Sequence, residues 1–133
     1  MVNDAELIEA ARAVRLNAYS PYSGFAVGAA VLAASGRVYV GCNVENASFP
    51  LTVCAERTAI GSAVAAGETR ILKVAVITDT EPPASPCGAC RQVIFELGSD
   101  AAVIVASLNG HRHDTTIRAL LPEGFDGAVL RKG

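Results

Sequence analysis

The chain lacks a strong excess of charge, a long apolar run and any low-complexity segment. Its 133 residues carry a net charge of -2 at pH 7, which gives no general attraction for a polyphosphate backbone and argues against nucleic acid as a partner. The longest apolar run, Phe25 to Ala34, is far shorter than the roughly 20 residues that a membrane helix needs. Acidic residues follow the first three positions and no cationic start is present, so we expect no signal peptide, no membrane partner and a cytoplasmic protein.

The sequence does contain many hydrophobic residues, which are spread along the whole chain. Hydrophobic residues make up 51% of the chain, and charged residues only 18%. This balance argues against wholesale disorder and suits one domain over residues 1–133 with a single buried core. The near-neutral charge fits a small neutral substrate better than DNA or RNA.

Apolar periodicity and turn signals predict that helices and strands alternate along the chain. We predict helices over residues 3–17, 54–66 and 87–97, and strands over residues 25–33, 38–42, 71–78 and 102–107. Residues 115–121 form either a short strand or a short helix. This order predicts a layered α/β fold with a mixed sheet. The polar residues 43–46, which follow a core strand, either line a site or form a solvated turn.

Three of the four cysteines stand where a helix is predicted to begin. Cys54 opens one helix, and Cys87 and Cys90 open the next with the spacing of half a zinc site. Helix N-termini favour thiolates, which are good zinc ligands. If both helices follow strands of one sheet, their N-termini can lie side by side. We therefore predict that the three cysteines hold one zinc ion and leave its fourth position to water.

The alternative is a structural zinc site in which Cys42 is the fourth ligand and no position is left for water. Such a site would make the protein a zinc-stabilised binding module. Against it, Cys42 falls on a predicted strand, where a lone cysteine is usually a small core residue. Glu56 favours the catalytic reading, because a closed site has no use for a nearby carboxylate. Taken alone, Glu56 also fits a first-turn acid that the helix dipole stabilises.

Charge at the predicted zinc site calls for a positive neighbour. Three thiolates and one Zn²⁺ leave a net negative charge, which makes a bound hydroxide harder to form. Arg57 is the first candidate to offset it and Arg91 the second, although either also fits a solvated surface arginine. His111 and His113 follow a turn signal, and we expect them to be solvated loop residues rather than ligands.

Five stretches of the chain resemble one family. Cys54-Ala55-Glu56 and Pro86-Cys87-Gly88-Ala89-Cys90-Arg91-Gln92 resemble the zinc signature of the cytidine deaminase superfamily. Residues 20–30, 43–48 and 120–125 are similar to the small homotetrameric cytidine deaminases that act on free nucleosides. The resemblance covers nearly the whole chain. It implies a three-layer α/β/α sandwich around a mixed, roughly five-stranded sheet.

The resemblance also implies an activity. The expected reaction is hydrolytic deamination of cytidine and deoxycytidine to uridine and deoxyuridine, with release of ammonia, as in pyrimidine salvage. One Zn²⁺ per subunit and a homotetramer are expected. A deaminase of another cytosine nucleoside, such as blasticidin S, remains the alternative within the class.

Individual roles follow from the same resemblance. Cys54, Cys87 and Cys90 would bind zinc, and Glu56 would be the catalytic proton shuttle. The expected substrate contacts are Phe25 on the base, the N–H of Ala55 on the pyrimidine oxygen, and Asn43 and Glu45 on ribose hydroxyls. Arg57 would contact the ligand sulfurs.

Two aromatic residues are expected to cross a subunit boundary. Phe125 would contribute to a neighbouring subunit's site. Phe49 occupies a position at which the family often has tyrosine. A hydroxyl-mediated contact is therefore not available from Phe49, although packing could survive.

Overall fold

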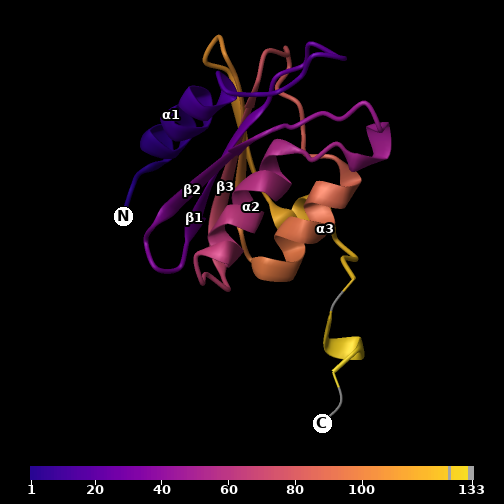
Figure 1. The fold of residues 1–133 in the computed structure, drawn as a ribbon. Helices are drawn as coiled ribbons and strands as arrows, with labels where there is room; N and C mark the ends of the chain where they lie inside the picture. The colour runs from indigo at the N-terminus through magenta and orange to yellow at the C-terminus, as the bar shows by residue number, and fades with distance from the viewer. Residues whose placement is uncertain (126, 132–133) are drawn as a thin grey trace.

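The computed structural model describes residues 1–125 and 127–131 (Figure 1). Its helices are α1 (Asp4–Arg15), α2 (Ala55–Ala65), α3 (Gly88–Leu97) and α4 (Ile117–Leu120). Its strands are β1 (Gly28–Ala33), β2 (Val38–Cys42), β3 (Ile71–Thr78), β4 (Ala102–Ser107) and β5 (Arg112–Thr116). Two 3-10 helices cover Phe49–Leu51 and Gly127–Val129. The predicted alternation of helices and strands is confirmed.

The five strands form one mixed sheet in the order β2-β1-β3-β4-β5. β3 and β4 are parallel, while the other neighbouring pairs are antiparallel. A parallel pair needs a crossover connection, and α3 supplies it between β3 and β4. The prediction of a mixed, five-stranded sheet is therefore confirmed.

The sheet separates two apolar layers, as the three-layer expectation requires (Figure 1). Alternate residues of β1 point to opposite faces. Ala29 and Val31 pack with α2 and α3, whereas Ala30 and Leu32 pack with α1. Because both faces are covered, β1 is buried along its whole length and its sequence is a continuous apolar run rather than an alternating one.

Helix starts follow the predicted signals. The side chain of Asn3 accepts a hydrogen bond from the N–H of Glu6, and the Glu6 carboxylate accepts one from the N–H of Asn3, which completes a capping box. Cys54 and Cys87 are the N-caps of α2 and α3. Each helix therefore begins within one residue of the predicted position.

One predicted strand boundary and one predicted loop position are wrong. The first strand begins at Gly28 rather than Phe25, because the side chain of Asn43 binds the backbone of residues 25 and 27 and keeps them out of the ladder. His113 lies on β5 and not in a loop, although it is exposed. β5 has only polar residues and pairs only with β4, so no apolar alternation marks it.

Two glycines allow the helices to approach the sheet closely. A Cβ on Gly28 would lie 2.0 Å from the carbonyl oxygen of Ala11 in α1, and one on Gly41 would lie 2.3 Å from the backbone nitrogen of Ala59 in α2. Only glycine fits at such contacts. Within the described residues, no helix combines the length and the hydrophobicity needed to cross a bilayer.

Candidate active site

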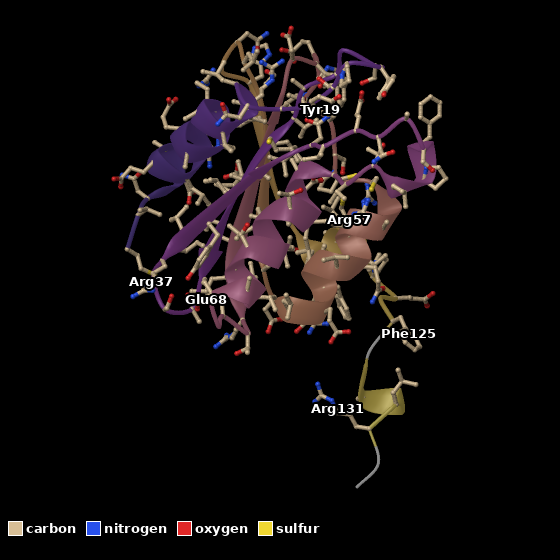
Figure 2. All side chains as sticks on the ribbon, viewed as in Figure 1. Tyr19, Arg37, Arg57, Glu68, Phe125 and Arg131 are labelled. Carbon is tan, nitrogen blue, oxygen red and sulfur yellow. The ribbon has the colours of Figure 1, made fainter. Side chains whose placement is uncertain are left out.

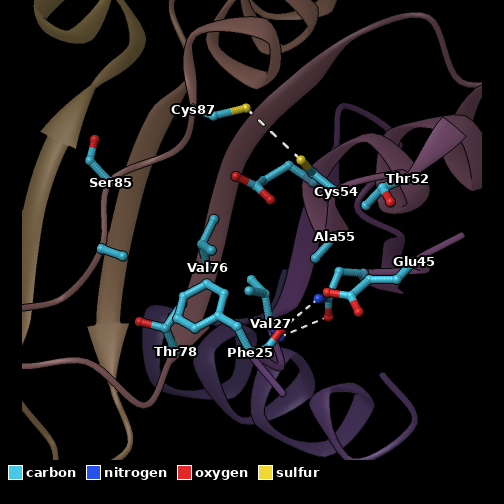
Figure 3. Close-up of a pocket in the computed structure, with 13 residues that line it drawn as sticks. Phe25, Val27, Glu45, Thr52, Cys54, Ala55, Val76, Thr78, Ser85 and Cys87 are labelled. Atoms are coloured by element: carbon cyan, nitrogen blue, oxygen red, sulfur yellow. Dashed lines mark hydrogen bonds between the residues drawn. The ribbon is translucent and has the colours of Figure 1, made fainter. Parts of the chain in front are cut away.

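The N-termini of α2 and α3 bring three sulfur atoms together. The Sγ atoms of Cys54, Cys87 and Cys90 all lie within 4.8 Å of one another, and those of Cys54 and Cys87 are 3.9 Å apart. Figure 3 shows Cys54 and Cys87 facing each other at one end of a cavity. Cys90 lies one turn further along α3 and is fully buried.

The sulfur geometry fits a zinc ion. Ligands that sit about 2.3 Å from one tetrahedral zinc are separated by about 3.8 Å, close to the observed Cys54–Cys87 distance. Cys42 is not part of the cluster, and no other group of three or more possible ligands gathers among residues 1–125 and 127–131. The donor set therefore leaves one tetrahedral position without a protein ligand.

The electrostatics of the cluster also call for a cation. The pKa of Cys54 is lowered to about 5 by hydrogen bonds from the thiol of Cys90 and from Arg57. The pKa of Cys90 is raised, chiefly because its thiol donates to Cys54 and because it is buried. A thiolate on Cys54 thus disfavours ionisation of Cys90, and a divalent metal ion bound to both sulfurs would offset this repulsion.

Glu56 is in the first turn of α2 and only 4% exposed. Burial raises the pKa of its carboxyl group, and the negative charge of Cys54 raises it further. A buried acid with a raised pKa beside a ligand cluster is suited to accept and return a proton.

The two arginines that the sequence offered as charge partners have different surroundings. Arg57 points Nη2 at the Cys54 sulfur, 3.6 Å away, and at the Thr52 carbonyl oxygen, 3.4 Å away. Arg91 instead donates to the Pro86 carbonyl at 2.8 Å, the Leu120 carbonyl at 2.9 Å and the Ser85 hydroxyl at 2.9 Å. Of the two candidates for offsetting the charge, Arg57 is therefore the one whose side chain contacts a ligand sulfur, while the hydrogen bonds of Arg91 go to oxygen atoms.

A cavity of about 270 Å³ opens from the cluster. It is lined by seven residues that the sequence singled out, namely Phe25, Asn43, Glu45, Cys54, Ala55, Glu56 and Cys87. Sequence reasoning missed the remaining lining residues, Val27, Thr52, Val76, Thr78, Ala84 and Ser85. Thr78 ends an apolar strand as a buried polar residue, which is a signal that could have found it. Figure 3 shows Phe25 and Thr78 at the end of the cavity away from the cysteines.

Asn43 and Glu45 leave β2 and bind the backbone of the loop before β1. Asn43 is 7% exposed; its Nδ2 donates to the carbonyl of Phe25 at 2.7 Å, and its Oδ1 accepts from the N–H of Val27 at 2.9 Å. Glu45 accepts from the N–H groups of Tyr22 and Ser23. Both side chains also border the cavity.

Phe49 and Phe125 do not line this cavity. Phe49 is 69% exposed, stacks edge-on against Tyr22, and borders a neighbouring hollow that shares Glu45 and Thr52 with the first. Phe125 is 57% exposed in the segment after α4, away from Arg57 (Figure 2). Its backbone forms two hydrogen bonds with the side chain of Gln92. Neither ring belongs to the pocket within a single chain.

Comparison with known proteins agrees with this geometry. Residues 1–107 match the family model for the "Cytidine and deoxycytidylate deaminase zinc-binding region". A cytidine deaminase of Sporosarcina psychrophila is 48% identical over 121 residues, covering 90% of this chain and 89% of the relative. A cytidine deaminase of Mycobacterium tuberculosis is 43% identical over 108 residues, covering 81% and 78%.

Solved structures extend the likeness to the fold. The crystal structure of cytidine deaminase from Burkholderia pseudomallei superposes with a TM-score of 0.90 at 48% identity, covering 93% of this chain and 100% of that one. The Mycobacterium leprae enzyme gives a TM-score of 0.79 at 38% identity, covering 92% and 100%. Matched in sequence, in fold and in its three-cysteine cluster, this chain belongs to the cytidine and deoxycytidylate deaminase family.

Proposed function

We propose that this protein deaminates cytidine and deoxycytidine to uridine and deoxyuridine by zinc-dependent hydrolysis. The observation that carries this proposal is the shared opening of the sulfur cluster and the buried Glu56 carboxyl into one cavity. Family membership and relatives that are themselves named cytidine deaminases support it.

Cys54, Cys87 and Cys90 would hold one zinc ion per chain. When bound, zinc supplies Lewis acidity that lowers the pKa of a water molecule toward 7. Glu56 would take a proton from the attacking water as the water oxygen adds to C4 of the cytosine ring, and would deliver that proton to ring N3. Glu56 would then take the proton of the new C4 hydroxyl group and pass it to the exocyclic amine, so that the C4–N bond breaks, ammonia leaves and C4 keeps a carbonyl oxygen. The raised pKa of Glu56 suits both transfers.

The residues that border the cavity would orient the substrate. Phe25 would pack against the base, and the N–H of Ala55 would meet the pyrimidine oxygen. Asn43 and Glu45 would bind ribose hydroxyls, which favours a plain nucleoside over blasticidin S. Arg57 would offset part of the negative charge of the sulfur cluster, since its guanidinium lies against the Cys54 sulfur.

We also propose that residues 1–133 act as a single catalytic domain in a homotetramer. The large exposed rings of Phe49 and Phe125 support it, because apolar groups left uncovered on one chain often mark an interface. Three thiols this close stay reduced most readily in the cytoplasm, where we place the enzyme in pyrimidine salvage.

A single assay tests the proposal. Purified protein is added to cytidine, deoxycytidine and blasticidin S in parallel, the loss of cytosine absorbance is followed, and zinc is measured in the same sample. We expect turnover of the first two substrates and about one zinc per chain. Zinc-loaded protein that leaves every cytosine nucleoside intact would refute the proposed activity, and preferred turnover of blasticidin S would favour the alternative substrate.

A further inference from the structure

We infer that Ser23 is a positioning residue for sugar recognition, an inference that rests on the proposed action on nucleosides. Ser23 lies in the loop before β1 and borders the hollow next to the catalytic cavity. Its hydroxyl donates a hydrogen bond to Glu45 Oε2 and accepts one from the N–H of Phe25 at 3.0 Å. One hydroxyl group thus joins the residue expected to bind the sugar to the residue expected to bind the base.

The acceptor count on Glu45 shows what Ser23 leaves available. A carboxylate offers about four acceptor positions. The N–H groups of Tyr22 and Ser23, at 2.9 Å and 3.2 Å, occupy Oε1, and the Ser23 hydroxyl occupies one position on Oε2. One position remains on Oε2, enough for a single sugar hydroxyl. The Ser23 hydrogen bond also lowers the pKa of Glu45, so the carboxylate is ionised and ready to accept.

Phe25 is fixed by the same group of side chains. Its N–H donates to Ser23, and its carbonyl accepts from Asn43 Nδ2 at 2.7 Å. The two residues proposed to bind ribose therefore also hold the backbone that carries the Phe25 ring, one directly and one through Ser23. Binding the sugar and packing the base then draw on one preorganised unit, which reduces the ordering that binding requires.

Within the described residues, the N–H groups of Tyr22 and Ser23 hold Oε1 of Glu45, but the Ser23 hydroxyl alone holds Oε2. Ser23 and Phe25 are exposed, and Gly24 between them has a φ of 70°, a conformation that keeps the turn tight. Without the hydroxyl, Oε2 loses its only fixed partner among the described residues and the N–H of Phe25 loses its acceptor. The carboxylate would then be held through Oε1 alone, and the backbone of Phe25 through its carbonyl alone, so both groups would be less firmly oriented.

Steady-state kinetics of Ser23→Ala and Ser23→Thr on the zinc-loaded enzyme test this role. We expect Ser23→Ala to raise KM for cytidine about tenfold with kcat nearly unchanged, because the lost hydrogen bond acts on a charged group and not on the reacting atoms. Ser23→Thr keeps the hydroxyl and should restore KM. An unchanged KM in Ser23→Ala, or a loss confined to kcat, would overturn the inference.

Sugar analogues separate a positioning role from general damage to the loop. KM is measured for cytidine, 2′-deoxycytidine and 3′-deoxycytidine with wild type and Ser23→Ala. For the analogue that lacks the hydroxyl bound by Glu45, the roughly tenfold penalty should shrink toward unity, since the positioned acceptor then has no donor. An equal penalty on all three sugars would contradict the role assigned to Ser23.

The chain supplies a matched control in Ser35, which donates in the same way to the carboxylate of Glu68. Glu68 lies well apart from Tyr19 (Figure 2), whose carbonyl accepts a hydrogen bond from the N–H of Glu45. Ser35→Ala should leave every KM unchanged. An equal rise in KM in Ser35→Ala would show that the effect is not local to the sugar site.

Amide hydrogen exchange at Phe25 gives a readout that does not depend on activity. Its N–H should exchange about tenfold faster in Ser23→Ala and at the wild-type rate in Ser23→Thr and Ser35→Ala. Wild-type protection in Ser23→Ala would remove the link to Phe25. Zinc-loaded wild type that ignores cytidine would instead refute the proposed function, so the two failures are distinguishable.

Discussion

The Arg57 guanidinium approaches the Cys54 sulfur to 3.6 Å through Nη2, while its buried Nε–H has no hydrogen-bond partner among the described residues. A buried donor without a partner costs about 1–3 kcal/mol, so this placement needs a compensating gain. The gain is electrostatic, since the guanidinium helps to lower the pKa of Cys54. Arg57 thus stabilises negative charge on the Cys54 sulfur.

Arg57→Ala should therefore weaken catalysis while zinc stays bound. We expect kcat to fall about tenfold, because excess negative charge at the cluster disfavours ionisation of the attacking water. The measurement is kcat across pH together with metal content. Arg118→Ala is the control, because in the described part of the chain Arg118 pairs with exposed Asp100 and lies over Phe95 rather than beside a ligand sulfur. Full activity of Arg57→Ala at every pH would show that the charge compensation is unnecessary.

Glu56→Gln should bind zinc normally and lose at least about 10²-fold in kcat, because the amide cannot carry a proton. In wild type, the pKa of Glu56 is raised from 4.5 by burial. The basic form is therefore lost as pH falls through that raised value, and the acidic limb of kcat/KM should lie above pH 4.5. Normal turnover by the glutamine variant would remove Glu56 from the mechanism.

Substitution of single cysteines tests which thiols hold the metal. Cys90→Ser should lose zinc and activity together, because the buried Cys90 belongs to the three-sulfur cluster. Cys42→Ser should keep both, since Cys42 lies outside the cluster on β2. Metal analysis after dialysis against a chelator gives the result directly. Zinc lost from the Cys42 variant would revive the closed four-cysteine site.

Arg91 should stabilise the wall of the pocket rather than offset the negative charge of the sulfur cluster. Its three hydrogen bonds join Ser85 and Pro86, which precede Cys87, to the carbonyl of Leu120. Lysine keeps the charge but cannot form the same planar fork. We expect Arg91→Lys to lower the free energy of unfolding by about 1 kcal/mol in urea titrations, because the part-buried carbonyl groups of Pro86 and Leu120 lose donors. An unchanged free energy of unfolding would mean that the three hydrogen bonds of Arg91 do not contribute to stability.

Acid should weaken the attachment of α1 to the sheet. Asp4 pairs with Lys73 of β3 and with Arg112 of β5, and the Lys73 hydrogen bond is the main cause that lowers the pKa of Asp4 below 3.8. The stability that this pKa shift provides is present above pH 3.8 and is lost as pH falls through the lowered value. Asp4→Asn should destabilise the protein by about 1 kcal/mol at pH 7, a figure reduced for solvent screening.

The same substitution should cost little below the pKa of Asp4, where the wild-type carboxyl is also neutral. Thermal or urea unfolding at several pH values gives the comparison. Asp100→Asn, in the more exposed pair with Arg118, should have almost no effect at any pH. A constant penalty for Asp4→Asn across the acid range would point to packing rather than charge.

Local signals were enough to predict most of the fold. Runs such as β3 and β4 are mostly apolar, and the cap signals of α1, α2 and α3 lie within a residue or two of the observed starts. β5 was not predicted as a separate strand, because its side chains are polar. Its formation depends on pairing with β4, which is a tertiary interaction.

The candidate site divides in the same way. The cysteines and Glu56 could be singled out because helix starts and ligand spacing are local properties. The partners of Arg91 and the hydrogen bonds of Ser23 could not, since they depend on loops that only the folded chain brings together. Asn43 is intermediate: its place after a strand hinted at a site, but its hold on Phe25 and Val27 did not show in the sequence.

The contact between Gly41 and α2 sets a limit on how this pocket can be redesigned. Any larger residue at position 41 would push against the backbone of Ala59 and Ala55, and so would move the helix that carries Glu56. Attempts to admit bulkier bases by directed evolution should therefore vary cavity residues that lie outside α2 and β2, such as Val76, Thr78 or Ala84.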